Sequence, residues 1–260
     1  MLKKVLFFGR KNDSNSIKVL SHLRKKSKIV QVIWSVNPED KLKYKKILYK
    51  NYDYIFSFRS FFILKNNLIK KAKFAAINFH PGPPEYRGTG CLNYAMYDNA
   101  KYYGVTTHLM DKKIDYGKII NVKRFKILKK NSVESLLNKA HKMLFEQAIE
   151  LINLLSKNHN NLSKLIYKSR KERWSKKITK RKELDEFYNI KKNISHKELI
   201  KRIRACYMHD SFKPYFMLHN FKFTLMSPSY EKTGKIPKYK MYFDLPLDLK
   251  KKYERNKNRK

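Results

Sequence analysis

The chain has 260 residues, 42% of them hydrophobic, which is enough to bury one large core or a core with an appendage. Its first apolar run, Val5–Phe8, is too short for a signal-peptide core, and no later run approaches the roughly 20 apolar residues of a membrane helix. Cys91 and Cys206 are too few for a disulfide framework and do not have metal-site spacing. We therefore expect a reduced, cytoplasmic protein with no membrane partner and no metal.

The net charge of +40 would suit a nucleic-acid partner, because clustered Lys and Arg bind phosphates. The lysines are instead spread along the whole chain beside many Asn, Ile, Tyr and Phe, as an AT-rich coding sequence would produce. Excess charge of this kind affects solubility and non-specific attraction rather than fold. The charge permits a nucleic-acid partner without predicting one.

Strands alternate with helical stretches in the first half of the chain, which is typical of a parallel sheet covered on both faces. The predicted strands are Val5–Gly9, Ile29–Ser35, Tyr54–Phe58 and Ala75–Phe79. The predicted helices are Ser16–Lys25, Asp40–Tyr49 and Leu64–Lys71. We therefore predict an α/β fold with a Rossmann-like, doubly wound, mostly parallel sheet. Ligands bind at the carboxyl ends of the strands in such sheets, and His80 would lie at one of these ends.

The next predicted elements are a helix at Leu92–Tyr97 and two strands at Val105–Met110 and Lys118–Lys126. Ser132–Ser156 is the longest helical signal, with apolar residues that recur at helical spacing. This helix should close a catalytic domain over residues 1–156.

The remainder of the chain predicts a small α+β extension. Residues 157–182 are basic and weakly periodic, which indicates a connecting region whose largest aromatic is Trp174. A small subdomain is expected over residues 183–249. The basic run over residues 250–260 predicts a disordered tail.

Two local signals support this small subdomain. Ser195 could cap a helix at His196–Arg204, with Glu198 at the third helical position of a capping box. Phe212–Leu225 alternates aromatic and polar residues around His219 and Asn220, which predicts a β-hairpin.

The segment Ile77–Ile120 resembles the catalytic domain of folate-dependent formyltransferases, which act on glycinamide ribonucleotide, methionyl-tRNA or nucleotide sugars. The family pattern Asn-x-His-Pro stands at Asn78–Pro81, and the pattern Asp-x-Gly stands at Asp115–Gly117. The pair Arg87–Gly88 and the strand start Gly104–Thr106 lie between them.

The residues themselves agree with this resemblance. Asn78 and His80 are one residue apart on a strand, so both side chains point to the same side of it. An amide and a protonated imidazole can stabilise the oxyanion of formyl transfer. Asp115 can raise the pKa of His80 and accept the proton of the attacking amine, directly or through a water. Taken singly, His80 could be a structural histidine, hydrogen-bonded at a strand end, and Asp115 could be an ordinary turn aspartate. Together they predict a catalytic trio of Asn78, His80 and Asp115.

The resemblance implies 10-formyltetrahydrofolate as co-substrate, held largely by backbone groups of two segments in a mostly apolar cleft. The residues predicted to bind it are Phe62, Ile63, Leu64, Asp111, Lys112, Lys113 and Ile114. The alternative for Phe62, Ile63 and Leu64 is that they are ordinary core residues.

The loop after His80 is rich in Pro and Gly, which fixes a rigid path whose backbone groups can face a ligand. The residues predicted to contact the substrate are Pro81, Gly82, Pro83, Arg87 and Gly88. Arg87 could pair with a substrate phosphate or brace a carboxylate such as Glu85 or Asp98. A tight loop without substrate contact is the alternative.

The predicted acceptor is a small-molecule amine, namely the amino group of a nucleotide-linked sugar made for a surface polysaccharide. The spelling of His80–Tyr86 and the region Trp174–Leu225 resemble the sugar-modifying branch of the family. With about 35 residues after Leu225, we do not expect the complete β-barrel of the tRNA enzyme. Initiator methionyl-tRNA is the alternative, and a non-catalytic nucleic-acid-binding protein on a formyltransferase scaffold is a third. The sequence leaves the oligomeric state open, a homodimer included.

Overall fold

The computed structural model describes residues 1–42, 47, 49–208, 213–226 and 240–244. The described chain divides into two compact units. The first contains Met1–Cys91, Lys101–Ile127 and Leu137–Thr179. The second contains Leu92–Ala100, Leu128–Leu136 and the chain from Lys180 onward.

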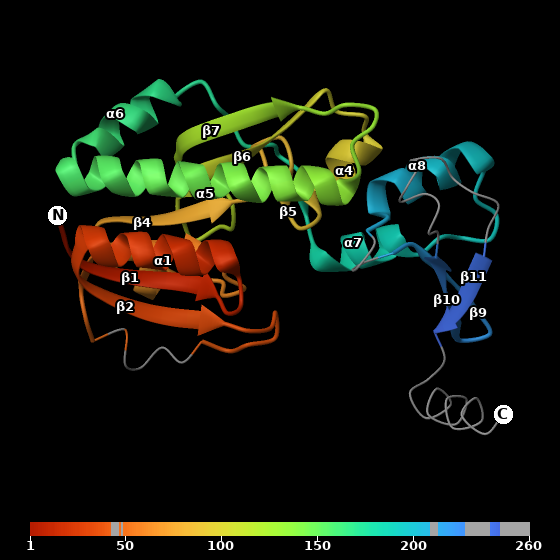
Figure 1. Cartoon of the computed structure of the whole chain (residues 1–260), viewed down its shortest axis with the longest axis horizontal. Helices are drawn as coiled ribbons and strands as arrows, with labels where there is room; N and C mark the ends of the chain where they lie inside the picture. Colours follow the sequence, from red (N-terminus) through yellow and green to blue (C-terminus); the bar gives the residue numbers. More distant parts are fainter. Residues whose placement is uncertain (43–46, 48, 209–212, 227–239, 245–260) are drawn as a thin grey trace. The chain divides into compact units, whose positions relative to one another are not determined.

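A six-stranded sheet forms the centre of the first unit, in the order β2-β1-β3-β4-β6-β7 (Figure 1). Its parallel strands are β1 (Leu2–Arg10), β2 (Ser27–Ser35), β3 (Tyr52–Phe58) and β4 (Ala72–His80). Its antiparallel strands are β6 (Tyr102–Leu109) and β7 (Ile119–Lys126). The prediction of a mostly parallel α/β sheet is therefore confirmed.

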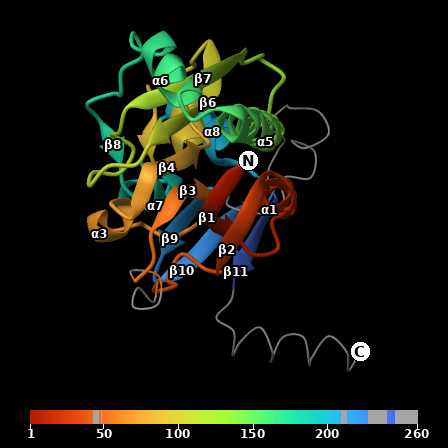
Figure 2. The ribbon, with the colours of Figure 1, turned by 90° about the vertical axis from the view of Figure 1, so that its left-hand side faces the viewer.

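Helices cover both faces of this sheet, which explains why the parallel strands are apolar almost throughout. Figure 2 shows α1 (Ser14–Lys26) and α5 (Val133–Lys157) on one side and the short α3 (Asn66–Ile69) on the other. The predicted helix at Leu64–Lys71 is thus reduced to a single turn. The predicted helix at Asp40–Tyr49 falls largely outside the described residues, which omit 43–46 and 48.

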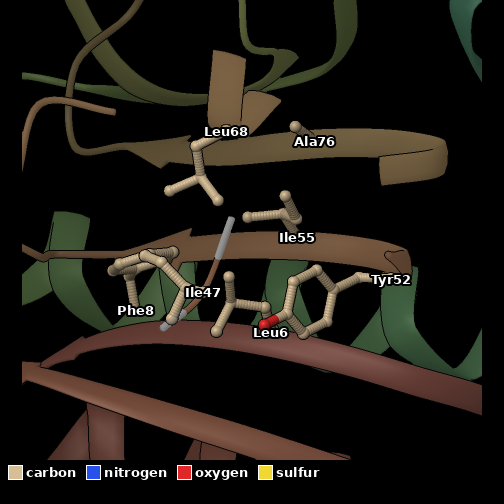
Figure 3. Close-up of a cluster of buried hydrophobic side chains, with 7 residues drawn as sticks. All are labelled: Leu6, Phe8, Ile47, Tyr52, Ile55, Leu68 and Ala76. Carbon is tan, nitrogen blue, oxygen red and sulfur yellow. The ribbon is translucent and has the colours of Figure 1, made fainter. Parts of the chain in front are cut away.

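A buried cluster fills the sheet face beneath α3 (Figure 3). Its members are Leu6, Phe8, Ile47, Tyr52, Ile55, Leu68 and Ala76. Side chains alternate between the two faces of a strand, so the face that carries Ala76 also carries the next even-numbered residues of β4. These residues are Asn78 and His80, and the core thus continues directly into the predicted site.

The region predicted to be a connector is more structured than expected. It contains α6 (Asn161–Lys168), which packs on β7, and β8 (Ile178–Thr179), which pairs with β5 (Arg87–Gly88). The basic composition of this region concealed these elements, because its few apolar residues are anchored by contacts far away in the sequence.

The second unit contains α4 (Cys91–Tyr97), α7 (Arg181–Tyr188), α8 (His196–Cys206) and the sheet β11-β10-β9. Its strands are β9 (Tyr215–Leu218), β10 (Phe221–Met226) and β11 (Lys240–Asp244). Helix α4 is fixed by Asn93, whose amide donates to the Tyr188 hydroxyl at 3.0 Å and to the Ala205 carbonyl at 2.7 Å. The helix α7 was not predicted.

The predicted Ser195 cap and the predicted hairpin are confirmed where the structure describes them, but the capping box is not. The Ser195 hydroxyl accepts a hydrogen bond from Glu198 N at 3.3 Å, and α8 follows. The Glu198 carboxylate, however, accepts from Tyr97 and Arg202 instead of closing the capping box. The hairpin turns at His219 and Asn220, both with positive φ, as a two-residue type I′ turn requires. The predicted tail at 250–260 lies outside the described residues.

Candidate active site

Two neighbouring strands bring the central polar side chains together on one sheet face. Asn78 and His80 lie near the carboxyl end of β4, which pairs antiparallel with β6. Asn78 stands opposite His108 and His80 stands opposite Thr106, so all four side chains share this face. The sequence predicted two of them, and the strand pairing adds His108.

Asp115 lies between the two imidazoles. Its Oδ2 is 3.5 Å from His80 Nδ1, and its Oδ1 is 3.5 Å from His108 Nε2. Gly88 N donates to Oδ2 at 3.2 Å. The two histidines and the aspartate are buried. His80 is 5%, His108 2% and Asp115 6% exposed. The structure thus brings the predicted His80 and Asp115 together in a buried cluster, with Asn78 half-buried beside them.

His108 lies between two members of the trio, Asn78 and Asp115. Its Nδ1 lies 2.7 Å from the Leu109 carbonyl, which can only accept, so Nδ1 carries a proton. Its Nε2 lies 3.2 Å from Asn78 Nδ2 and faces Asp115 from the other side. The same ring nitrogen of His108 thus faces both the amide and the carboxylate.

The burial of His80 and Asp115 makes their mutual charge important. Burial opposes the charged form of His80, but the negative charge of Asp115, helped by Cys91, raises the pKa of His80 to about 9. Burial also opposes ionisation of Asp115, yet His80 and His108 hold the pKa of Asp115 well below its usual range. At neutral pH the pair is therefore a protonated imidazole beside a carboxylate.

This pair predicts how stability varies with pH. Folding raises the pKa of His80 from 6.5 to about 9, so the folded state holds the extra proton between these values. The stabilisation is complete below pH ~6.5 and is lost as the pH rises through about 9. Urea unfolding from pH 6 to 10 should register this loss. A His80→Gln variant should show a flatter curve, and identical curves for both proteins would contradict the assignment.

Trp174 covers the two histidines. Its ring meets His108 edge-on at a centroid distance of 5.0 Å and His80 at 6.0 Å. Its indole N–H donates to the Gly117 carbonyl at 2.8 Å. The sequence singled out Trp174 only as the largest aromatic of the connecting region. Its position became visible only with the fold, because it lies about 60 residues beyond Asp115.

The loop after β4 is tied to the sheet through its own carbonyl groups. Tyr103 donates to the Pro81 carbonyl at 2.7 Å, and Thr106 donates to the Gly82 carbonyl at 2.8 Å. A Cβ at Gly82 would lie 2.7 Å from His80 Nε2, so this glycine permits the close approach of the loop to the imidazole. Pro83 is buried with Gly82, and their predicted contact with substrate stays a prediction.

Arg87 is 6% exposed and points to backbone groups. Its terminal nitrogens donate to the Ser175 carbonyl at 2.7 Å and to the Ile114 carbonyl at 3.1 Å. Glu85, one of the carboxylates considered for it, pairs with Arg124 at 2.7 Å instead. The alternative that Arg87 braces Glu85 is therefore wrong.

The two segments predicted to hold the folate converge on one core cluster. Phe62 and Leu64 from the first segment, and Met110 directly before the second, all pack against the cluster of Figure 3. Between and beyond these anchors, Ile63 and Ile114 are 68% and 47% exposed. Asp111, Lys112 and Lys113 are exposed as well. Anchored backbone with exposed apolar side chains suits a flat heteroaromatic ligand.

Two structural absences apply to the described ranges of the chain. There, no three His, Cys, Asp or Glu side chains come together in a way that could hold a metal ion. No helix in these ranges has the length and apolar character needed to cross a bilayer.

Comparison with known proteins finds relatives for part of the chain. Residues 45–150, which contain the whole trio, match the family model described as formyl transferase. Methionyl-tRNA formyltransferase from Listeria innocua is 34% identical over 82 residues, which are 31% of this chain and 26% of that protein. The matches with curated relatives span about a quarter or less of their length.

Solved structures extend the likeness over most of the fold. A likely sugar N-formyltransferase from Mycobacterium tuberculosis superposes with a TM-score of 0.62 and 19% identity, covering 84% of this chain and 93% of that one. The N-formyltransferase from Helicobacter canadensis, in complex with folinic acid and dTDP-3-aminofucose, gives 0.58 and 18%, covering 87% and 88%. Residues 45–150 of this chain therefore match the formyl transferase family model, and most of the chain has a fold similar to that of these two solved proteins.

Proposed function

We propose that this protein transfers a formyl group from 10-formyltetrahydrofolate to a primary amine. The observation that supports this most directly is the buried Asp115 carboxylate held between His80 and His108. A buried ion pair of this kind is costly to maintain unless it is used or well compensated. Its retention beside Asn78 argues against a decayed, purely nucleic-acid-binding scaffold.

The folate supplies the formyl group, and its pterin would be held by the segments that carry Phe62–Leu64 and Asp111–Ile114. The protein's own residues perform three tasks. Asn78 and protonated His80 donate hydrogen bonds to the oxygen that becomes negative when the amine nitrogen bonds to the formyl carbon. Asp115 accepts the proton that the attacking amine loses, directly or through a water. That proton is returned to the departing nitrogen when its bond to the formyl carbon breaks.

Burial of His80 and Asp115 serves this chemistry in two ways. Trp174 and the loop from Pro81 to Gly88 exclude water, which strengthens the interaction of His80 with a developing oxyanion. The Asp115 charge keeps His80 protonated at neutral pH, so the oxyanion donor is present before the substrate binds.

We propose a nucleotide-linked amino sugar as the acceptor. A likely sugar N-formyltransferase and an N-formyltransferase in complex with dTDP-3-aminofucose both match this chain over most of both lengths. Pro81, Gly82, Pro83 and Gly88 line the loop beside His80 and would face the acceptor. Initiator methionyl-tRNA remains the second candidate, because a curated relative bears that name and the net charge of +40 would attract a polyanion.

One assay separates these acceptors. The purified chain and 10-formyltetrahydrofolate are offered nucleotide-linked amino sugars and, separately, charged initiator tRNA, with release of tetrahydrofolate as the readout. Formylation of an amino sugar is the expected result, and the Asp115→Asn protein is the blank. Formylation of the tRNA alone would remove the sugar proposal, and no transfer to any amine would remove the enzymatic one.

A further inference from the structure

The backbone around Asp115 is strained and needs external support. Asp115 has a φ of +46°, a left-handed conformation that is uncommon for a non-glycine residue. Such a conformation persists only where neighbouring groups hold it. The hydrogen bond from Gly88 N holds the carboxylate, but it does not hold the chain on either side of Asp115.

The chain on both sides of Asp115 is held by hydrogen bonds to carbonyls. Arg87 donates a hydrogen bond to the carbonyl of Ile114, one residue before Asp115, at 3.1 Å. The Trp174 indole N–H donates to the carbonyl of Gly117, two residues after Asp115, at 2.8 Å. The other arm of Arg87 reaches the Ser175 carbonyl, which lies next to Trp174. Arg87 thus joins the Asp115 loop to the segment that covers the histidines.

The surroundings of Arg87 are those of an internal brace. The guanidinium lies over the Tyr116 ring at 5.2 Å and near the Trp174 ring at 6.0 Å. Among the residues that the structure describes, no carboxylate pairs with it, and its Nε–H is buried without a hydrogen-bond partner. Its planar fork is used on two carbonyls, a geometry that the single ammonium group of lysine cannot reproduce.

We propose that Arg87 is a positioning residue, which fixes the Asp115 loop so that the carboxylate meets both imidazoles, and that it is not a ligand for an acceptor phosphate. The catalytic consequence rests on the proposed formyl transfer. The structural consequence, which is the placement of Asp115 against His80, does not depend on it.

The test compares Arg87→Lys, which keeps the charge but loses the fork, with the unchanged protein. We expect the His80 titration, followed by NMR of ¹⁵N-labelled imidazoles, to move from about 9 toward its ordinary value of 6.5. We expect kcat to fall by about 10²-fold, as for a small misplacement of a catalytic group. The KM for a nucleotide-linked amino sugar should stay within about twofold, because no substrate contact is lost.

Arg124→Lys is the matched control, because Arg124 is a partly exposed arginine that pairs with Glu85 and Glu172. It should leave both readouts unchanged. If Arg87→Lys does not fold, Arg87→Gln, whose amide can still donate to one carbonyl, gives the same two measurements.

An increase in KM with an unchanged His80 titration would overturn the proposal in favour of phosphate binding. If the unchanged protein formylates no amine, the proposed function fails. The His80 titration then still decides whether Arg87 positions Asp115.

Discussion

Replacement of Asp115 by Asn is expected to lower kcat for formyl transfer by about 10²–10⁴-fold, the range over which general acid–base groups contribute. An amide cannot accept the proton of the attacking amine. It also removes the negative charge that keeps His80 protonated in its buried position. One substitution therefore weakens both the proton acceptor and the oxyanion donor.

Two measurements make this prediction specific. The alkaline limb of the pH dependence of kcat/KM should move from about 9 to lower pH in the variant, because His80 loses its partner. The His80 imidazole, followed by NMR, should titrate at correspondingly lower pH. Asp98→Asn, at an exposed aspartate, is the control and should behave as the unchanged protein. A full rate in Asp115→Asn would contradict the role given to the carboxylate.

Replacement of Gly117 by Ala is expected to destabilise the chain and to disable the site together. A Cβ at this position would lie 1.8 Å from the Leu109 carbonyl oxygen and 2.7 Å from its carbon. Both atoms belong to the backbone next to His108, so neither can move aside as a flexible side chain would. Overpacking of this kind costs about 1–3 kcal/mol or more.

Urea unfolding, followed by tryptophan fluorescence, should therefore have a lower midpoint in Gly117→Ala at an unchanged slope. The same shift of the backbone would displace the carbonyl that accepts the Trp174 hydrogen bond, so the loss of activity should exceed the loss of folded protein. The neighbouring Lys118→Ala, at an exposed position, should alter neither quantity. Native stability in Gly117→Ala would mean that the close approach to Leu109 is absent in solution.

Alternation along β4 explains why much of the site could be predicted from the sequence. Apolar residues on both faces of β4 predict a buried strand, and the Pro and Gly that follow predict its end. Alternation along that strand then places Asn78 and His80 on one face, whichever strands lie beside it. Asp115 followed from the motif, since its distance from His80 depends on how the chain returns to the sheet. In each case the decisive information is local or is carried by the family pattern.

His108 could not be predicted in the same way. Its place opposite Asn78 depends on the antiparallel register of β4 and β6, which loop lengths and packing determine together. Trp174 depends on a contact across about 60 residues from a segment whose composition indicates only solvation. The described part of the structure also places Arg87 on carbonyls, whereas arginine in a loop suggests an anion from sequence alone.

Trp174 and Ser175 are hydrogen-bonded to Gly117 and Arg87, and this has a consequence for synthesis on the ribosome. The sheet strands that carry Asn78, His80 and His108 are complete once β7 ends at Lys126. Trp174 and Ser175, which lie over this face, are added some 50 residues later, and the ribosomal tunnel delays their arrival further. A nascent chain therefore passes through a stage in which the sheet can form while its buried charges still face water. Truncation at the end of α5 should preserve that stage permanently and give a folded but open protein.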